Sequence, residues 1–203
     1  GPFISPEDGP RGAHPLEHVR APDPGEVDAW QRASGGRVRM VTLSPHWPGS
    51  PAFIEGLVRQ GILVAIGHTD ADPAQIHAAA AAGASLSTHL GNGASAMLAR
   101  HPNLLWAQLA DDRLSASFIA DGHHLPGDTF EVMLRAKGLD RGILVSDVAA
   151  LGGMPPGIYD QPIGGRVEVT DAGRLGVLGT PYLAGALRSL AEDVAIAVRL
   201  TGR

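Results

Sequence analysis

Short apolar runs alternate with amphipathic segments along most of the chain. Five runs are rich in residues that favour β-strands, and each has the length of a buried strand. They span residues 37–44, 62–69, 84–90, 115–121 and 142–147. Segments with apolar residues at helical spacing lie between these runs. The pattern therefore predicts alternating strands and helices, which is typical of a parallel sheet flanked by helices.

Start and stop signals support three predicted helices between the strands. Apolar residues recur at helical spacing over 51–60. A second helix is predicted from Asp72, which precedes Pro73, to Gly83, because Asp caps helices, Pro fits the first turn and Gly ends them. A third is predicted over 128–137, where an Asp is again the expected cap.

The last quarter of the chain has a different pattern. Residues 164–179 predict a β-hairpin that turns at Asp171–Gly173. Residues 182–200 have apolar faces at helical spacing and predict one long helix. The hairpin is predicted as an insertion, near residues 163–179, into the alternating pattern.

Two parallel α/β architectures fit this alternation. A doubly wound sheet normally has a Gly-rich phosphate loop after its first strand, and this chain has none there. In a (β/α)8 barrel, functional residues follow the strand ends, and every predicted strand here ends near a polar or ionisable residue. Eight βα units need about 250 residues. The sequence therefore predicts a partial (β/α)8 TIM-type barrel, with residues 1–203 as one domain of a longer protein.

Composition narrows the class of protein. The chain has 203 residues, of which 44% are hydrophobic and 18% charged, so it can form a folded core. A net charge of −5 argues against general nucleic-acid binding, and no apolar run reaches the roughly 18 residues of a membrane span. The absence of cysteine excludes disulfides and thiolate ligands from this sequence. We expect a soluble, cytoplasmic protein.

Ionisable residues at successive strand ends suggest a metal site. His68 and His89 end consecutive strands, whose ends lie side by side in a parallel sheet. Imidazole suits zinc and iron, although a hydrogen-bonded histidine pair is the simpler alternative. Asp147 ends the fifth strand and either caps a helix or acts as a general base. A histidine of the Asp121–His124 segment is a candidate to polarise a substrate carbonyl.

Seven short segments together carry a family resemblance, and they occur in the family's order over almost the whole chain. The chain resembles the N-acetylglucosamine-6-phosphate deacetylases of the amidohydrolase superfamily. The segments are Gly1–Pro6 with Arg11–His14, Gly67–Thr69, Thr88–Asn92, Asp121–His124, Ser146–Asp147, Pro156–Tyr159 and Leu183–Gly185.

The resemblance implies a role for each matching residue. It implies that His68 and His89 are metal ligands, that Asp147 is the catalytic acid and base, and that His124 contacts the substrate amide. It also implies a zinc ion, or iron, as cofactor. The implied substrate-binding residues are Ala13, His14, Asn92, Gly93, Arg100, Asp121, His124, Leu183, Ala184 and Gly185. In the family, the arginine at the position of Arg100 often reaches the neighbouring subunit of a homodimer.

Two departures from the family pattern concern the site. The family has a metal-binding Glu directly before the segment that starts here at Gly1, and it has Asn-Ala-Met where this chain has Asn92, Gly93 and Ala94. His101 follows Arg100 on the same side of the expected pocket. The resemblance implies metal-dependent deacetylation of N-acetylglucosamine 6-phosphate. The alternatives are another N-acyl or cyclic amide substrate, or a non-catalytic homologue that binds a sugar phosphate.

Overall fold

A computed structural model describes residues 2–202 and contains a five-stranded parallel sheet. Gly1, the first residue of the first family segment, lies outside the described residues. Neighbouring strands pair in chain order, with Val41 opposite Val64 and Phe118 opposite Leu144. All five strands start within the predicted runs, so the parallel sheet predicted from the sequence is confirmed. The strands are β1 (Met40–Leu43), β2 (Leu63–Ile66), β3 (Leu86–Ser87), β4 (Ser115–Phe118) and β5 (Gly142–Leu144).

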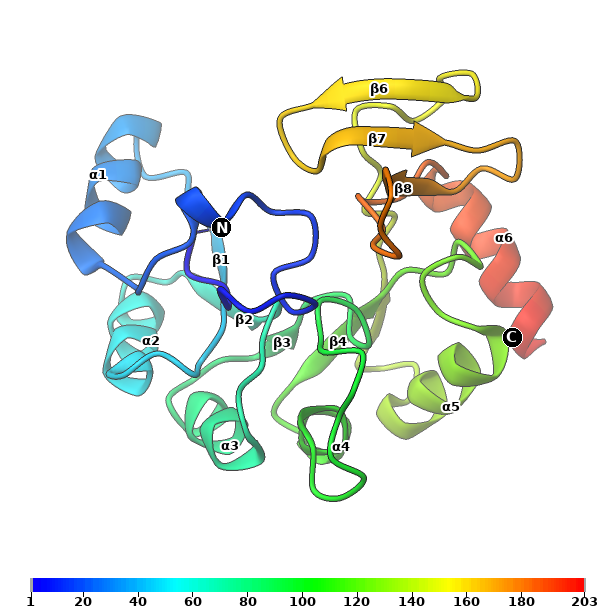
Figure 1. Cartoon of the computed structure of the whole chain (residues 1–203). Helices are drawn as coiled ribbons and strands as arrows, with labels where there is room; N and C mark the ends of the chain where they lie inside the picture. The colour runs from blue at the N-terminus through cyan, green and yellow to red at the C-terminus, as the bar shows by residue number, and fades with distance from the viewer. Residues whose placement is uncertain (1, 203) are drawn as a thin grey trace.

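Helices follow the strands, and α2 to α5 lie on the same side of the sheet (Figure 1). In the described residues the sheet is open, because β1 and β5 form its two edges. The helices are the 3-10 helix η1 (Leu16–His18), α1 (Pro24–Ser34), α2 (Ser50–Arg59), α3 (Pro73–Ala81), α4 (Leu104–Ala110), α5 (Gly127–Lys137) and α6 (Leu190–Thr201).

The predicted helix signals hold for α2 and α3 but only in part for α5. The side chain of Asp72 accepts the N–H of Gln75, and the side chain of Gln75 accepts the N–H of Asp72, so α3 begins with a full capping box. In α5, Asp128 lies inside the first turn and is not the cap, because the helix begins at Gly127. The sequence analysis missed α1 and α4, although Asp23 and Asn103 cap them.

A second, antiparallel sheet contains the predicted hairpin. Strands β7 (Gly165–Val169) and β8 (Leu175–Val177) form that hairpin, and β6 (Gly157–Gln161) adds a third strand that was not predicted. The predicted helix over 182–200 is wrong in its first half. Leu183 pairs with Gly176 and Ala186 pairs with Val148, so this segment is extended. The helix starts only after Ser189, which caps it.

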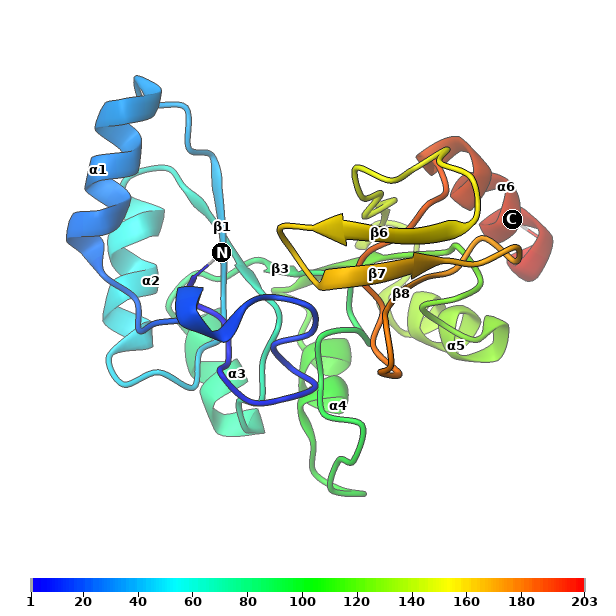
Figure 2. The same cartoon turned by 45° about the horizontal axis from the view of Figure 1, so that its top comes forward.

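Separate clusters of buried residues stabilise the two sheets. The larger clusters pack β1 to β4 against the helices and include Ile54, Ile66, Ile76 and Phe118, each fully buried. A smaller cluster around Val167 lies under the antiparallel sheet. The antiparallel sheet lies on the opposite side of the parallel sheet from α2 to α5 (Figure 1), and Figure 2 brings it towards the viewer. None of the helices in residues 2–202 has the length and apolar character needed to cross a bilayer.

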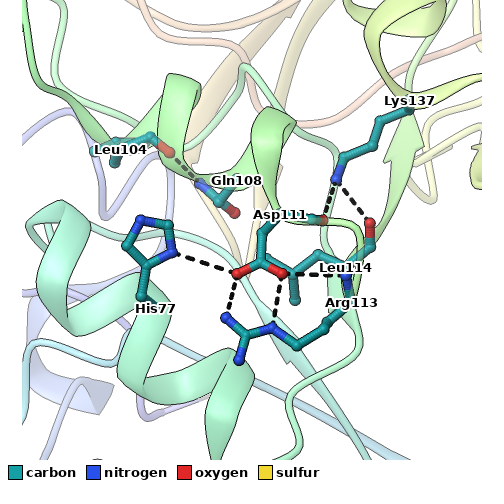
Figure 3. A network of polar contacts seen from close by, with 7 residues as sticks. All are labelled: His77, Leu104, Gln108, Asp111, Arg113, Leu114 and Lys137. Carbon is teal, nitrogen blue, oxygen red and sulfur yellow. Dashed lines mark hydrogen bonds and ion pairs between the residues drawn. The ribbon is translucent and has the colours of Figure 1, made fainter.

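A buried lysine ties helices together near the amino end of β4. The ammonium of Lys137 donates to the carbonyls of Asp111, at 2.9 Å, and Leu114, at 2.7 Å (Figure 3). The carboxylate of Asp111 accepts from Arg113 and lies 3.3 Å from the His77 ring. Burial lowers the pKa of Lys137, and the two carbonyls offset the cost of burying its charge. The contacts of this network join segments of α3, α4 and α5, so its role at this end of the sheet is structural.

Candidate active site

The carboxyl ends of the parallel strands bring four ionisable side chains to one pocket. His68 follows β2, His89 follows β3, His124 follows β4 and Asp147 follows β5. All four line a cavity of about 810 Å³ that lies between the parallel strand ends and the antiparallel sheet. The structure therefore assembles the residues that the strand-end pattern singled out.

Three of these residues have an unusual backbone. Among residues 2–202, the only non-glycine residues with positive φ are His68 at 50°, His89 at 30° and Asp147 at 51°. The left-handed region is strained for residues with a Cβ, and such residues cluster at functional sites. Each strand thus ends in a sharp change of direction that points an ionisable side chain into the same pocket.

The two predicted metal ligands face each other. The Nε2 atoms of His68 and His89 lie 3.0 Å apart, and the rings are nearly perpendicular. The Nδ1–H of His68 donates to the carbonyl of Pro10 at 2.9 Å, which fixes the tautomer and leaves Nε2 with a free lone pair. The buried Nδ1 of His89 has no partner among the described residues.

This arrangement fits two ligand positions of a divalent cation. Two nitrogens bound tetrahedrally to one zinc ion at about 2.0–2.1 Å lie about 3.3 Å apart, close to the observed separation. Burial, and then the neighbouring charge on His89, lowers the pKa of His68 to about 3, so its imidazole is neutral as a ligand must be. Within residues 2–202 no three His, Asp or Glu side chains form a complete ligand group.

Asp121 holds His124 in place. The Nδ1–H of His124 donates to Asp121 Oδ2 at 2.8 Å, and the backbone N–H groups of His123 and His124 donate to Asp121 Oδ1. Burial raises the pKa of Asp121, but these hydrogen bonds, first that of the His124 ring, outweigh burial and lower the pKa to about 2. Asp121 is therefore ionised, and it leaves Nε2 of His124 free for a ligand.

Asp147 does not cap a helix. The residue after it, Val148, pairs with Ala186 in an extended bridge, and the Asp147 carbonyl accepts the N–H of Ala186 at 2.9 Å. The helix-capping alternative is therefore wrong. The backbone bond orients the residue, and its exposed carboxylate lines the pocket.

The comparisons with known proteins point to one group of enzymes. No family model matches the chain. N-acetylglucosamine-6-phosphate deacetylase of Lysinibacillus sphaericus is 35% identical over 96% of the chain, and N-acetylgalactosamine-6-phosphate deacetylase of Escherichia coli O157:H7 is 34% identical over all of it. The chain spans about half the length of these relatives, namely 49% and 52%.

Solved structures give the same result. The N-acetyl-D-glucosamine-6-phosphate deacetylase of Mycobacterium smegmatis, solved in complex with N-acetyl-D-glucosamine-6-phosphate, superposes on the whole chain with a TM-score of 0.92 at 33% identity. The chain covers 52% of that structure. The relatives of this chain are amino-sugar-phosphate deacetylases. The family resemblance inferred from the sequence is confirmed.

Most of the substrate-binding residues implied by the deacetylase resemblance line the pocket. They are Ala13, His14, Asn92, Gly93, His124, Leu183, Ala184 and Gly185. The His14 ring packs edge-on against His68, with ring centroids 4.8 Å apart. Gly93 has φ of +56°, and a Cβ there would lie 2.9 Å from His68 Nδ1, so a side chain at this position would require the loop or the His68 ring to shift.

Two of the implied residues lie elsewhere. Asp121 is buried behind His124 and does not line the pocket, so in this structure its contacts are those of a positioning residue. Arg100 is exposed outside the pocket, and no lysine or arginine lines the pocket in the described part of the chain.

The structure also adds pocket residues that the sequence analysis missed. Gln161, the last residue of β6, lines the pocket together with Pro162 and Ile163, which follow it in the turn to β7. Tyr182 lines the pocket next to Leu183. Two signals in the sequence could have indicated these residues. Pro162 is a turn-forming residue, and Tyr182 is an aromatic residue directly before a family segment.

Proposed function

We propose that this chain is part of an enzyme that hydrolyses the N-acetyl amide of N-acetylglucosamine 6-phosphate to glucosamine 6-phosphate and acetate. The observation that supports it best is the convergence of His68, His89, His124 and Asp147 in one pocket. The chain resembles amino-sugar-phosphate deacetylases along its whole length, so fold and chemistry support the same reaction.

In this proposal Asp147 and His124 act on the substrate directly. Asp147 takes the proton of the attacking water and returns it to the leaving amine, which is general base and then general acid catalysis. In its doubly protonated form, His124 donates from Nε2 to the amide oxygen, where negative charge develops, while its Nδ1–H stays bound to Asp121. Asp121 keeps the His124 ring oriented through its bond to Nδ1.

His68 and His89 would hold a divalent cation through their Nε2 atoms. When bound, zinc or iron supplies the Lewis acidity that polarises an amide carbonyl and makes water a better nucleophile. The Pro10 carbonyl would keep the His68 ring in the ligating tautomer, as partners behind metal ligands generally do.

A homodimer is part of the proposal, because the phosphate needs a cation and none lines the pocket among residues 2–202. Arg100 is exposed outside the pocket of its own chain, so it is available to the pocket of a second copy. Guanidinium binds phosphate well, because its donors match two phosphate oxygens. Nucleic-acid and membrane partners have no role in this proposal.

The closed (β/α)8 barrel is also proposed and rests on two observations. Both β1 and β5 are edges of the parallel sheet within the described residues, and the relatives are about twice as long as this chain. A barrel would pair both edges and leave no strand unpaired. The single catalytic domain and the cytoplasmic location stay predictions.

N-acetylgalactosamine 6-phosphate is a second candidate substrate. The E. coli relative named for it matches the whole chain at an identity close to that of the N-acetylglucosamine-6-phosphate deacetylases. Acetate release from each sugar phosphate, and from free N-acetylglucosamine, tests the proposal with the intact protein. Turnover of a phosphorylated amino sugar, several-fold better than of the free sugar, is the expected result. Acetate release from none of them would contradict it.

A further inference from the structure

Two polar side chains on the antiparallel side of the pocket have no role so far. Gln161 ends β6 and Tyr182 precedes Leu183, and both line the pocket. Neither side chain hydrogen-bonds to another residue between positions 2 and 202, and both are only partly buried. Their amide and hydroxyl groups are therefore free to bind a ligand.

The turn that carries Gln161 is fixed from two sides. The N–H of Gly164 donates to the carbonyl of Ala13 at 2.9 Å, which joins the turn to the N-terminal loop. A Cβ on Gly164 would lie 3.3 Å from the Ala184 Cβ, so the turn also packs against the opposite segment. Gln161 itself pairs with Gly165 at the end of the ladder. In both views the β6–β7 turn lies beside the N-terminal loop (Figures 1 and 2).

Tyr182 is fixed in the same way by its backbone. Its carbonyl accepts the N–H of Val177 at 2.9 Å, and its N–H donates to Thr180 Oγ1 at 3.2 Å. The next residue, Leu183, pairs with Gly176. The two side chains are thus held on a rigid part of the fold, which is what a precise binding site requires.

The chemistry of this side of the pocket suits sugar hydroxyls. An amide offers donors and an acceptor, and a phenol offers one donor and one acceptor, without charge at neutral pH. A phosphate would instead call for a cation, and none lines the pocket in the described residues. The relatives are named for two epimeric sugar phosphates, which differ only in the orientation of the C4 hydroxyl.

We propose that Gln161 and Tyr182 bind the ring hydroxyl groups of the amino sugar and determine which epimer the enzyme prefers. This inference rests on the proposed function. His124 and Asp147 hold the amide on one side of the pocket, while the antiparallel sheet contacts the hydroxyl-bearing ring from the other.

The test compares Gln161→Leu and Tyr182→Phe with Tyr159→Phe in the intact protein. Tyr159 lies on the same sheet, but its hydroxyl donates to the Pro155 carbonyl at 2.8 Å and does not line the pocket. We expect each pocket variant to raise KM for its preferred sugar phosphate about three- to tenfold, the scale of one neutral hydrogen bond, with kcat within twofold. Tyr159→Phe should match the wild type.

Deoxy-sugar substrates show whether a hydroxyl is the partner. The wild type should have a three- to tenfold lower kcat/KM for the 4-deoxy sugar phosphate, or for another ring-deoxy analogue, than for the parent sugar phosphate. For that analogue, one of the two pocket variants should have almost the same kcat/KM as the wild type, because the hydroxyl that its side chain would bind is already missing. The inference is overturned if both pocket variants keep wild-type kcat/KM, or if their losses add fully to that of every deoxy analogue.

Calorimetric binding of the same sugar phosphates separates this inference from the proposed function. Binding that both variants weaken about three- to tenfold, without turnover by the wild type, would support the inference and contradict the proposed deacetylation. Turnover by the wild type, with unchanged binding in both variants, would support the proposed deacetylation and contradict the inference. A wild type that binds none of these sugars would overturn both.

Discussion

The two sheets contribute different kinds of groups to the same pocket. The parallel sheet supplies the facing pair His68 and His89 and the candidate reacting groups His124 and Asp147. The antiparallel sheet and the extended segment after β8 supply the amide of Gln161, the phenol of Tyr182 and apolar side chains. Side chains of the first kind can change protonation or bind a cation, and those of the second kind can form hydrogen bonds without charge. The comparison suggests that reaction and recognition are divided between the sheets.

Backbone conformation follows the same division. On the parallel sheet, left-handed φ values fall on His68, His89 and Asp147, where the side chain is needed. In the antiparallel sheet they fall on glycines such as Gly164 and Gly173, which adopt them without strain. Strain is tolerated where it orients a chemical group and avoided where a turn only connects strands.

The largest effect is expected from removing the proposed cation ligands at the parallel strand ends. His68→Ala and His89→Ala should each abolish bound metal and activity in the intact protein, because each removes one of few ligands. Elemental analysis measures the metal, and His18→Ala, on an exposed 3-10 helix, is the control. Full metal content in both site variants would mean that the facing histidines are only a hydrogen-bonded pair.

A smaller effect concerns Arg100, the cation proposed to bind the phosphate, because no lysine or arginine of residues 2–202 lines the pocket. Arg100→Ala should raise KM for the phosphorylated sugar about 10- to 100-fold, the scale of a charge-assisted hydrogen bond, and leave the free sugar almost unchanged. Arg100→Lys should keep only part of the wild-type affinity for the phosphorylated sugar, because the lysine ammonium lacks the planar, forked donors of guanidinium. The exposed Arg59 on α2 offers the control Arg59→Ala. Equal losses on both sugars would remove Arg100 from phosphate binding.

The smallest effect concerns Asp193 on α6, which lies close enough to Asp121 and His124 for their charges to act on it. It is fully buried and neither of its oxygens has a partner in residues 2–202. Burial, and then the charge on Asp121, raises the pKa of Asp193 to about 6. A carboxyl with a raised folded-state pKa binds its proton more strongly when folded, so its contribution to stability falls as pH rises from about 4 to about 6.

Asp193→Asn should therefore help stability more at pH 7 than at pH 4. The expected difference between its effects at the two pH values is about 1–3 kcal/mol in the free energy of unfolding. Chemical denaturation of wild type and variant measures it, with the exposed Asp140 replaced by Asn as the control. An equal effect of Asp193→Asn at both pH values would show that the carboxyl does not ionise within this range.

The sequence predicts the parallel half of the molecule better than the antiparallel half. A buried parallel strand has a local apolar pattern, and the carboxyl ends of neighbouring parallel strands lie at the same edge of the sheet. The apolar runs before His68, His89 and Asp147 therefore predict both the strands and the pocket that these three residues line. Strand β6 was missed because its exposed and partly buried residues alternate without a strong apolar face, so its pairing with β7 depends on tertiary contacts.

Tertiary pairing also explains the other differences. Residues 183–187 have apolar spacing that fits a helix, but the bridge between Val148 and Ala186 holds them extended. The sequence places Asp121 three residues before His124, yet only the fold shows that the carboxylate turns back to the ring instead of facing the pocket. Nothing in the helical pattern of α6 indicates that Asp193 is buried without a partner.

The central claim is that the parallel strand ends carry out the reaction, and Asp147→Asn tests it most directly. Asn keeps the shape and much of the hydrogen bonding of Asp but cannot accept the proton. The account predicts that kcat in the intact protein falls by about 10²- to 10⁴-fold, while bound metal and KM stay close to wild type. An Asn variant that turns over at the wild-type rate, with its metal content unchanged, would contradict the account.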